Sequence, residues 1–400
     1  MTDDRNLNIR YSAAQAVLWM SFCTVITFAV VFLQSRGYSN SSTGIIMAAS
    51  NLAGFFLSGT MSDLIDRYEK VTVSMMIRVT LGIQALSIAF LFFLPGKSVA
   101  VSLIFGAGMA AVLARNPLIT QLCVVLQYAG RNIRFNICRG IGSLAYVIAS
   151  VFMGRLVVLF SPEILNVIAA VFLLLQLAID IGLERKLRSC GGSMRIQRSG
   201  SASTTSEFIR KNPRFIILVI GATIIFFGHN TITYYLINVL RNLGGNEETM
   251  GYVNGLSAAY EIPIMFLFVP LTKRLKISSV MKFFFVAFAL KNTLMALVGS
   301  IPAFCAALSL QGLSYAVYIT ASVGYAKTVI PPEDAAKGQA FIANVSMIGA
   351  VLAGLIGGRL YDTVGVNTTL LIDAAIMIVG AILGILGTQR TDGKPAATAP

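Results

Sequence analysis

The stretch ERKLRSCGGSMRIQRSGSASTTSEFIRKNPR, residues 184 to 214, is the longest polar segment inside this chain. It is basic and rich in Ser and Gly, a composition typical of a flexible linker. Long apolar runs lie on both sides of it, and it falls near the midpoint of the chain. We therefore expect two halves of similar size joined by a cytoplasmic linker.

The composition is that of a membrane protein. Of 400 residues, 56% are hydrophobic and 12% are charged, and the mean hydropathy is +0.77. Soluble domains carry about 25% charged residues, and no soluble fold could hide so much apolar surface. Apolar runs of about twenty residues recur, whereas outer-membrane strands would alternate in shorter segments. The fold class we expect is an all-α polytopic membrane protein.

Twelve apolar runs, bounded by charges, Pro and Gly, predict twelve transmembrane helices. The expected ranges are 11–33, 43–61, 71–94, 98–126, 135–160, 164–183, 215–240, 249–271, 277–298, 302–329, 340–358 and 368–386. Asp3 and Asp4 precede the first run and no A-x-A site follows it, so we expect a retained span rather than a cleaved signal peptide.

These runs predict four segments along the chain. They are an N-terminal six-helix bundle (1–183), the basic linker (184–214), a C-terminal six-helix bundle (215–387) and a cytoplasmic tail (388–400). The GRL triplets in FMGRLVVLF (152–160) and IGGRLYDTV (356–364) occupy corresponding places in the two halves. Two related six-helix halves are the plan of a transporter.

The distribution of basic residues predicts the topology. Most of the 31 Lys and Arg residues fall in segments on one side, and the predicted outer loops hold only Arg36, Lys97, Arg241 and Arg359. The positive-inside rule then places both termini in the cytoplasm, with the chain in the inner membrane. This bias also accounts for the net charge of +14, so we expect no nucleic-acid partner.

Neither ATP-driven nor metal chemistry is indicated. The GKS triplet at Gly96–Ser98 has Leu91 where a phosphate loop would have its first glycine. The cysteines have no metal-ligand spacing, so we expect no metal and no other cofactor. They are Cys23, Cys123, Cys138, Cys190 and Cys305. Paired acidic or nucleophile motifs are absent, so we expect no enzyme.

The segment GTMSDLIDRYEK, residues 59 to 70, resembles the loop signature of the major facilitator superfamily between helices 2 and 3. Gly59, Asp63 and the basic Arg67 match, while Leu64 and Asp66 depart from the pattern. The resemblance implies two six-helix bundles, and an aspartate that helps to hold one access state. The alternative is a solvated cluster of loop charges.

The segment FNICRGIGSLAY, residues 135 to 146, is similar to the helix 5 motif of the lactose permease-like branch, the oligosaccharide:proton symporters. Phe135, Arg139, Gly142 and Ser143 match, with Asn136 in place of a glycine. Arg139, Ser143 and Tyr146 share one helix face. The resemblance implies that Arg139 binds sugar hydroxyls and that Tyr146 stacks on the sugar ring. Alternatively, Arg139 extends to the cytoplasmic interface.

Helix 4 supplies a polar stripe and a departure from that branch. Asn116 and Thr120 lie one turn apart, and we assign both to the solute site. The branch has an acid at the position of Thr120 that pairs with the helix 5 arginine. The counter-charge of Arg139 is therefore either a distant carboxylate such as Glu261 or the substrate itself.

The second half holds three candidate titrating residues, His229, Glu261 and Lys291. His229 is the only histidine, and histidine titrates near neutral pH. A buried carboxylate such as Glu261 must be neutral, paired or in contact with water, which suits a proton carrier. The alternatives are a neutral, hydrogen-bonded His229 and a structural Glu261–Lys291 ion pair.

Helix 10 offers polar and aromatic side chains on one face. Gln311 and Tyr315 are assigned to the solute site, next to Ser314 and Tyr318. The coupling glutamate of the lactose permease-like branch is replaced by Ser314, so the proton site expected in helix 10 is missing. Asp373, in helix 12, is assigned a structural role near the outer side.

These patterns together predict a proton-coupled symporter for a sugar, an oligosaccharide or a related polar or acidic solute. The alternative is an efflux antiporter for sugars or drugs on the same fold. The expected partners are the small-molecule solute, protons and membrane lipids, and the expected functional unit is a monomer.

Overall fold

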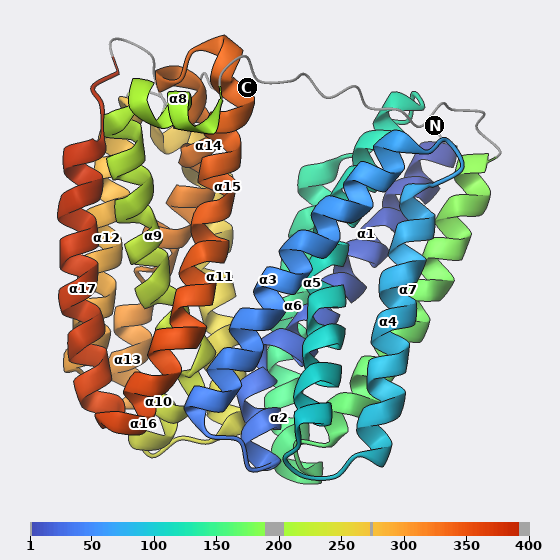
Figure 1. Cartoon of the computed structure of the whole chain (residues 1–400), viewed down its shortest axis with the longest axis horizontal. Coiled ribbons are helices and arrows are strands. Elements are labelled where there is room, and N and C mark those ends of the chain that lie inside the picture. Colours follow the sequence, from blue (N-terminus) through green and yellow to red (C-terminus); the bar gives the residue numbers. More distant parts are fainter. Residues whose placement is uncertain (1, 189–203, 273–274, 392–400) are drawn as a thin grey trace. The chain divides into compact units, whose positions relative to one another are not determined.

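Every element of the structure is a helix. The computed structural model describes residues 2–188, 204–272 and 275–391 (Figure 1). Most of the predicted linker (189–203) and most of the predicted tail (392–400) lie outside the described residues. No strand occurs within the described ranges, so the expected all-α fold class is confirmed.

The chain divides into two compact units. Unit 1 comprises Met1–Gln197 and Asn246–Gly255, and unit 2 comprises Arg198–Gly245 and Leu256–Pro400. The division falls inside one helix, α11 (Glu247–Thr272), so the first turns of this helix belong to unit 1.

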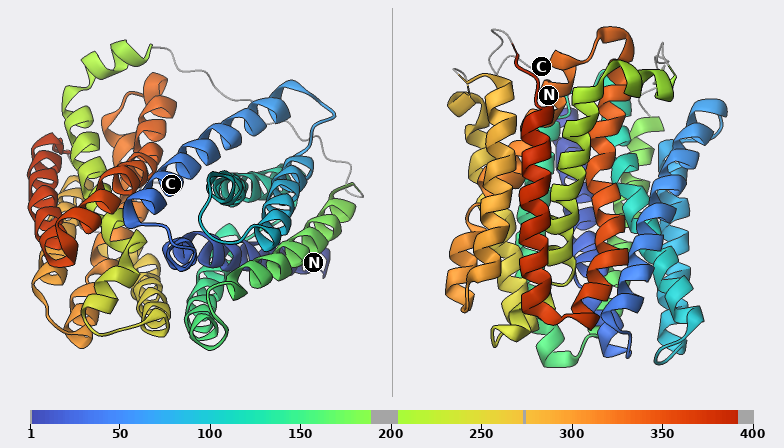
Figure 2. Two further views of the ribbon diagram at one scale, coloured as in Figure 1. Left: turned by 60° about the horizontal axis from the view of Figure 1, so that its bottom comes forward. Right: turned by 60° about the vertical axis from the view of Figure 1, so that its left-hand side comes forward.

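In unit 1, α1 packs against α6 and α7, and α4 packs against α5 and α7 (Figures 1 and 2). The elements of this unit are α1 (Thr2–Phe22), η1 (Cys23–Thr27), α2 (Ala29–Ser35), α3 (Asn40–Arg67), α4 (Val73–Phe93), α5 (Val99–Tyr128), α6 (Phe135–Phe160) and α7 (Ile164–Arg188).

In unit 2, α17 packs against α9 and α12, and α15 lies on the other side of α9 (Figure 1). The elements are α8 (Thr205–Lys211), α9 (Pro213–Tyr234), α10 (Leu236–Asn242), α12 (Ile277–Leu297), α13 (Ile301–Leu308), η2 (Gly312–Ala316), α14 (Val317–Val329), η3 (Pro332–Asp334), α15 (Ala335–Leu352), η4 (Ala353–Gly357), α16 (Gly358–Thr363) and α17 (Gly365–Gly387).

Glycines bring α9 and α17 into close contact. A Cβ atom added at Gly221 would lie 2.4 Å from the backbone nitrogen of Gly384, and one at Gly387 would lie 2.3 Å from that of Leu218. In a lipid environment, helices associate through such small residues because the solvent supplies no hydrophobic drive between them. The α9 and α17 helices are therefore held in close contact, and both carry polar residues of unit 2 that are described below.

The helices are long and apolar enough to cross a membrane. In the described part of the chain, ten helices meet this criterion, and the bent pair formed by α1 with η1 and α2 would be an eleventh. The remaining predicted span, 249–271, coincides with α11. Large apolar side chains face outward on these helices, such as Phe93 at 82% and Leu386 at 68% exposure. Such faces suit lipid, so the chain is a multi-pass membrane protein.

Three predicted spans are not continuous α-helices. The π-helical turns η1, η2 and η4 interrupt the predicted helices 1, 10 and 11. At η1 the helix axis bends by 43°. A π turn inserts one residue into the helical ladder and often marks a functional position. Two of these turns carry residues of the polar clusters described below, Thr27 in η1 and Tyr315 in η2.

The predicted linker contains regular structure at both described ends. Helix α7 continues to Arg188, and α8 begins where the side chain of Thr204 accepts a hydrogen bond from the backbone N–H of Glu207. Lys211 pairs with Glu207 one turn later at 2.8 Å. This hydrogen bond lowers the pKa of the exposed Glu207 carboxyl. The described part of the linker is therefore helical, where its composition suggested only a flexible chain.

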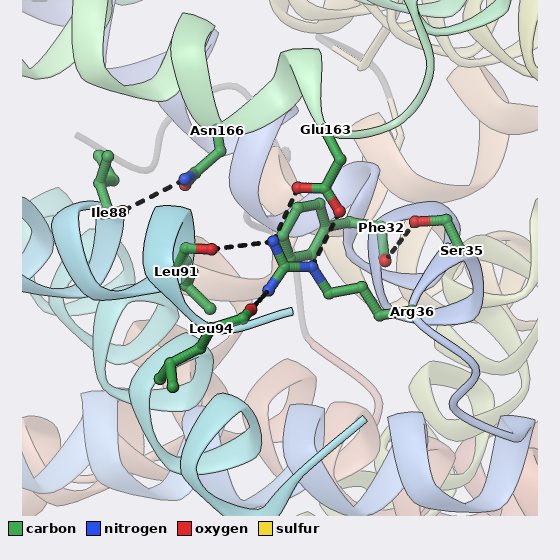
Figure 3. A network of polar contacts seen from close by, with 8 residues as sticks. All are labelled: Phe32, Ser35, Arg36, Ile88, Leu91, Leu94, Glu163 and Asn166. Carbon is green, nitrogen blue, oxygen red and sulfur yellow. Dashed lines mark hydrogen bonds and ion pairs between the residues drawn. The ribbon is translucent and has the colours of Figure 1, made fainter. Parts of the chain in front are cut away.

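Arg36 closes one end of unit 1. It follows α2 and binds both carboxylate oxygens of Glu163, at 2.9 and 2.7 Å (Figure 3). The same guanidinium donates to the carbonyls of Leu91 and Leu94 at the end of α4, and lies 4.6 Å from the ring centroid of Phe32. Its side chain is only 6% exposed. The predicted loop cation is thus a buried clamp across α2, α4 and the start of α7.

Arg36→Lys should destabilise unit 1. Lysine keeps the charge but cannot reach two carboxylate oxygens and two carbonyls at once, so we expect a loss of about 1–3 kcal/mol. Thermal unfolding of the purified protein in detergent measures this effect. The matched control is Arg359→Lys, at an exposed arginine of α16, which should leave the unfolding temperature unchanged. Equal shifts in the two variants would contradict the clamp.

Candidate functional site

A cation–aromatic cluster in unit 1 holds the arginine that the sequence singles out. The guanidinium of Arg139, on α6, lies 3.8 Å from the ring centroid of Trp19, on α1. Its Nη1 atom donates to Oγ of Ser143, one turn along, at 2.8 Å. A cation over an indole face is worth about 0.5–2 kcal/mol, depending on how far it is desolvated. The ring therefore compensates part of the cost of placing Arg139 in a membrane helix.

Gly142 lets the two helices come this close. A Cβ atom at this position would lie 2.8 Å from Cδ1 of Trp19 and 3.2 Å from the carbonyl oxygen of Gln15. The motif glycine is therefore required by the packing of α1 on α6, next to the arginine that it flanks in sequence.

Tyr146 completes the cluster one turn beyond Ser143. Its ring meets Trp19 edge to face, with centroids 6.3 Å apart, and its hydroxyl lies 3.0 Å from Oγ1 of Thr27 in η1. Trp19, Arg139, Ser143 and Tyr146 are all half-buried. We name these four residues with Thr27 the arginine–tryptophan cluster. It offers a fork of donors, two aromatic planes and hydroxyls on a partly accessible surface.

Asn116 and Thr120 do not join this cluster. Oγ1 of Thr120 donates to the backbone carbonyl of Asn116 on α5, at 3.2 Å, and no described hydrogen bond links either side chain to the cluster. Their assignment to a solute site stays a prediction. Glu261 belongs to unit 2, so its pairing with Arg139 also stays a hypothesis.

A chain of four polar side chains crosses the core of unit 2. Nζ of Lys291, on α12, donates to Oε1 of Gln311 at 2.7 Å and lies 3.5 Å from Nδ1 of His229, on α9. Nε2 of Gln311 donates to Oε1 of Glu261, on α11, at 2.9 Å. We name His229, Lys291, Gln311 and Glu261 the lysine relay. Lys291 is 1% exposed and Gln311 is 3% exposed, whereas His229 and Glu261 are half-buried.

The amide of Gln311 separates the two charges of the relay. Its oxygen faces the ammonium and its nitrogen faces the carboxylate, so each charged group has a dipole of the right sign. The sequence placed Glu261 opposite Lys291 as an ion pair or a proton site. The structure inserts Gln311 between them, and both polar atoms of this residue are engaged within the relay.

The π turn η2 places an aromatic ring next to the lysine relay. Gln311 directly precedes η2, and Tyr315 within it lies 5.4 Å from the ring of His229 and 6.0 Å from that of Phe226. The other two hydroxyls predicted on this face are bound to backbone. Ser314 donates to the carbonyl of Leu310 at 2.8 Å, and Tyr318 donates to that of Ile342 at 3.1 Å. Of the two tyrosines on this face, Tyr315 is half-buried and Tyr318 is buried.

Trp19 and Asp180 were not assigned to any cluster from the sequence. Trp19 carried a signal as the only tryptophan, in a span that also contains the polar Gln15. Asp180, on α7, pairs with Arg78 at 3.0 Å, and Arg78 also pairs with Glu184. Asp373, on α17, is 2% exposed and accepts a hydrogen bond from Asn292, and its position near the outer side of the membrane stays a prediction. For Asp180 and Asp373, the signal in the sequence was an acidic residue within an apolar run.

The helix 2–3 motif ends α3. Gly59, Asp63 and Arg67 are all exposed, and a Cβ atom at Gly59 would meet no described atom within 4 Å. Packing of unit 1 therefore does not require this glycine. The role of the motif in holding an access state stays a prediction.

No metal centre is evident in the described part of the chain. Among these residues, no group of three or more His, Cys, Asp or Glu side chains is placed to hold an ion.

Comparison with known families identifies the class. The chain matches the model of the MFS_1 like family over residues 9–372 and belongs to this family. It is accordingly a membrane transporter of the major facilitator type, and the resemblance to this superfamily is confirmed.

One curated relative and two solved structures show the same relationship. A protein of Deinococcus radiodurans named "Putative sugar efflux transporter" is 26% identical over 163 residues. This match spans 40% of the chain and 41% of that relative, so the chain covers about two fifths of its length. The nucleoside transporter NupG has a TM-score of 0.78 at 18% identity, over 98% of this chain and 100% of that one. An auto-inhibited POT family peptide transporter reaches 0.76 at 10% identity, over 98% and 99%. These structures show the fold alone.

The single tryptophan gives a direct probe of the arginine–tryptophan cluster. Removing the cation in Arg139→Ala should change the emission of Trp19, because the charge 3.8 Å from its ring is lost. The matched control is Arg155→Ala, at an exposed arginine on the same helix, which should leave the emission unchanged. An unchanged spectrum in Arg139→Ala would mean that the contact does not form in the folded protein.

Gln311→Leu should destabilise unit 2. The change leaves a buried ammonium and a carboxylate without the amide that bridges them, and we expect a cost of about 2–4 kcal/mol. Thermal unfolding of Gln311→Leu, Lys291→Met and the double variant forms a double-mutant cycle. The double variant should be less destabilised than the sum of the single variants. Strict additivity would contradict the relay.

Proposed function

We propose that the protein couples proton movement to the transport of a small hydroxyl-bearing solute by alternating access. The first candidate is symport of a sugar, an oligosaccharide or a related polar or acidic solute. The observation that supports this choice is the arginine–tryptophan cluster. Its fork of donors and its aromatic faces match the two faces of a sugar, the hydroxyl edge and the C–H plane.

In this proposal the solute meets Arg139 and Ser143 through hydrogen bonds and packs against Trp19 or Tyr146. Solute hydroxyls would replace the contact between Arg139 and Ser143 on α6. An acidic solute would in addition supply negative charge to Arg139. We place the protein in the inner membrane with both termini in the cytoplasm, each half acting as one six-helix bundle.

The lysine relay is proposed as the proton-coupling element. Protonation of Glu261 removes the charge that the Gln311 nitrogen faces, and the carboxyl gains a donor of its own. The amide then no longer has to hold its present orientation, and Lys291 can exchange its partner. His229 lies on the other side of the ammonium, so its charge state bears on the same equilibrium.

Efflux by antiport is the second candidate. The observation that favours it is the name of the Deinococcus relative, a sugar efflux transporter by description. The same two clusters would serve, with the proton and the solute moving in opposite directions.

Transport in proteoliposomes under an imposed pH gradient separates the two candidates. For symport, labelled sugars, disaccharides and nucleosides should accumulate when the outside is acidic. For antiport, they should accumulate when the inside is acidic. We expect Glu261→Gln to abolish accumulation driven by the gradient while solute counterflow persists, because only the coupling group is lost.

The matched control for this experiment is Glu248→Gln on the same helix, which should remain coupled. Failure of the wild-type protein to move any of these solutes would refute the proposed substrate class. Full coupling in Glu261→Gln would refute the role of the relay.

A further inference from the structure

A second carboxyl lies in the core of unit 2, outside the relay. Asp373, on α17, is 2% exposed, and its Oδ2 accepts a hydrogen bond from Nδ2 of Asn292, at 3.1 Å. Asn292 is 1% exposed and follows Lys291 on α12. The proposed coupling through Glu261 makes no use of this pair.

Two acceptor atoms of the pair are buried without a partner. They are Oδ1 of Asp373 and Oδ1 of Asn292. A buried acceptor left unpaired is unfavourable, because it has given up its hydrogen bonds to water, and with Asp373 ionised this applies to both atoms. A protonated Asp373 would instead carry an O–H donor on Oδ1 and keep Oδ2 as the acceptor for Asn292. Protonation of Asp373 at Oδ1 would therefore remove one unpaired acceptor and create an O–H donor of the kind that Oδ1 of Asn292 lacks.

The surroundings of Asp373 favour a proton over a metal ion. On α9, a Cβ atom at Gly228 would lie 2.7 Å from Oδ1 of Asp373, so backbone approaches the carboxyl closely there. On α12, the Lys291 ammonium interacts electrostatically with both Asp373 and Glu261. A metal cation would be repelled by this ammonium, and two unpaired oxygens are too few to replace its water shell.

The other titratable groups near Asp373 are His229, on α9 beside Gly228, and Tyr361, on α16. The Tyr361 hydroxyl is buried without a hydrogen-bond partner and interacts electrostatically with Asp373. The ring of Tyr235 covers that of Tyr361 at 4.9 Å. Lys291 is thus the charged partner that the two carboxyls share.

We propose that Asp373 is a second proton-binding site, which holds a proton while Lys291 is engaged with Glu261 through Gln311. One ammonium can neutralise only one of the two carboxylates, so with Lys291 engaged toward Glu261 the buried Asp373 carries a proton. When the proton passes from Asp373 to Glu261, the O–H bond of Asp373 breaks, an O–H bond forms at Glu261, and Lys291 becomes the counter-ion of Asp373. The three groups remain neutral together throughout. This exchange rests on the proposed function, whereas the resting protonation of Asp373 does not.

Infrared difference spectroscopy of the purified protein tests the resting state directly. Near neutral pH, we expect the wild-type protein to show a band from a protonated, buried carboxyl that shifts in deuterated water. Asp373→Asn should lose this band. The control Asp362→Asn, at an exposed acid, should keep it.

Asn292→Leu gives a second variant in case Asp373→Asn does not fold. It retains Asp373 but removes its amide partner, so the band should move in frequency rather than vanish. A band that survives in Asp373→Asn, that is unmoved in Asn292→Leu, or that appears only when sodium is replaced by potassium would overturn the proposal.

A transport experiment distinguishes a failure of this proposal from a failure of the proposed function. In proteoliposomes, solute-driven proton movement by the wild-type protein should change with pH by about tenfold per unit over part of its range. Asp373→Asn should flatten this dependence while solute counterflow continues. If the wild-type protein moves no solute, the proposed function fails and the infrared band still decides the protonation of Asp373.

Discussion

Every charge held inside these membrane helices has to be compensated by a neighbour, because the bilayer offers no water to do so. The structure meets this constraint in different ways. Arg36 binds a carboxylate and the exposed carbonyls of a helix end. Arg139 rests on an indole ring, and Lys291 faces an amide oxygen. Arg115 is completely buried and donates to Gln84 and Thr80, on α4.

The sequence predicted the helical fold because the length and composition of an apolar run specify a membrane span without reference to other segments. It did not predict the π turns. A single extra residue in the helical ladder leaves hydropathy unchanged, so η1, η2 and η4 are invisible in a pattern of apolar residues. The short helix α8 was also missed, although Thr204 and Glu207 form a recognisable capping pair.

Contacts between residues of one helix could be predicted from the sequence, whereas contacts between two helices could not. Helical spacing placed Arg139 and Ser143 together, and they are hydrogen bonded. The same spacing could not indicate that Trp19 would lie against Arg139, since that contact depends on how α1 packs on α6 through Gly142. For the same reason, Gln311 was assigned to a solute-binding face, although its two polar atoms meet Lys291 and Glu261.

Coupling between a solute and a proton requires one structural element that responds to both. In the proposed mechanism, the π turn η2 of unit 2 is the candidate for this role. Gln311 precedes it and is hydrogen bonded to Glu261, while Tyr315 within it contacts the ring of His229. If Glu261 titrates as proposed, a change in its charge would act through Gln311 on the backbone segment that also carries the half-buried ring of Tyr315. Because this segment departs from regular α-helical geometry, the proposed mechanism would let a change in Gln311 alter its local winding and so shift Tyr315.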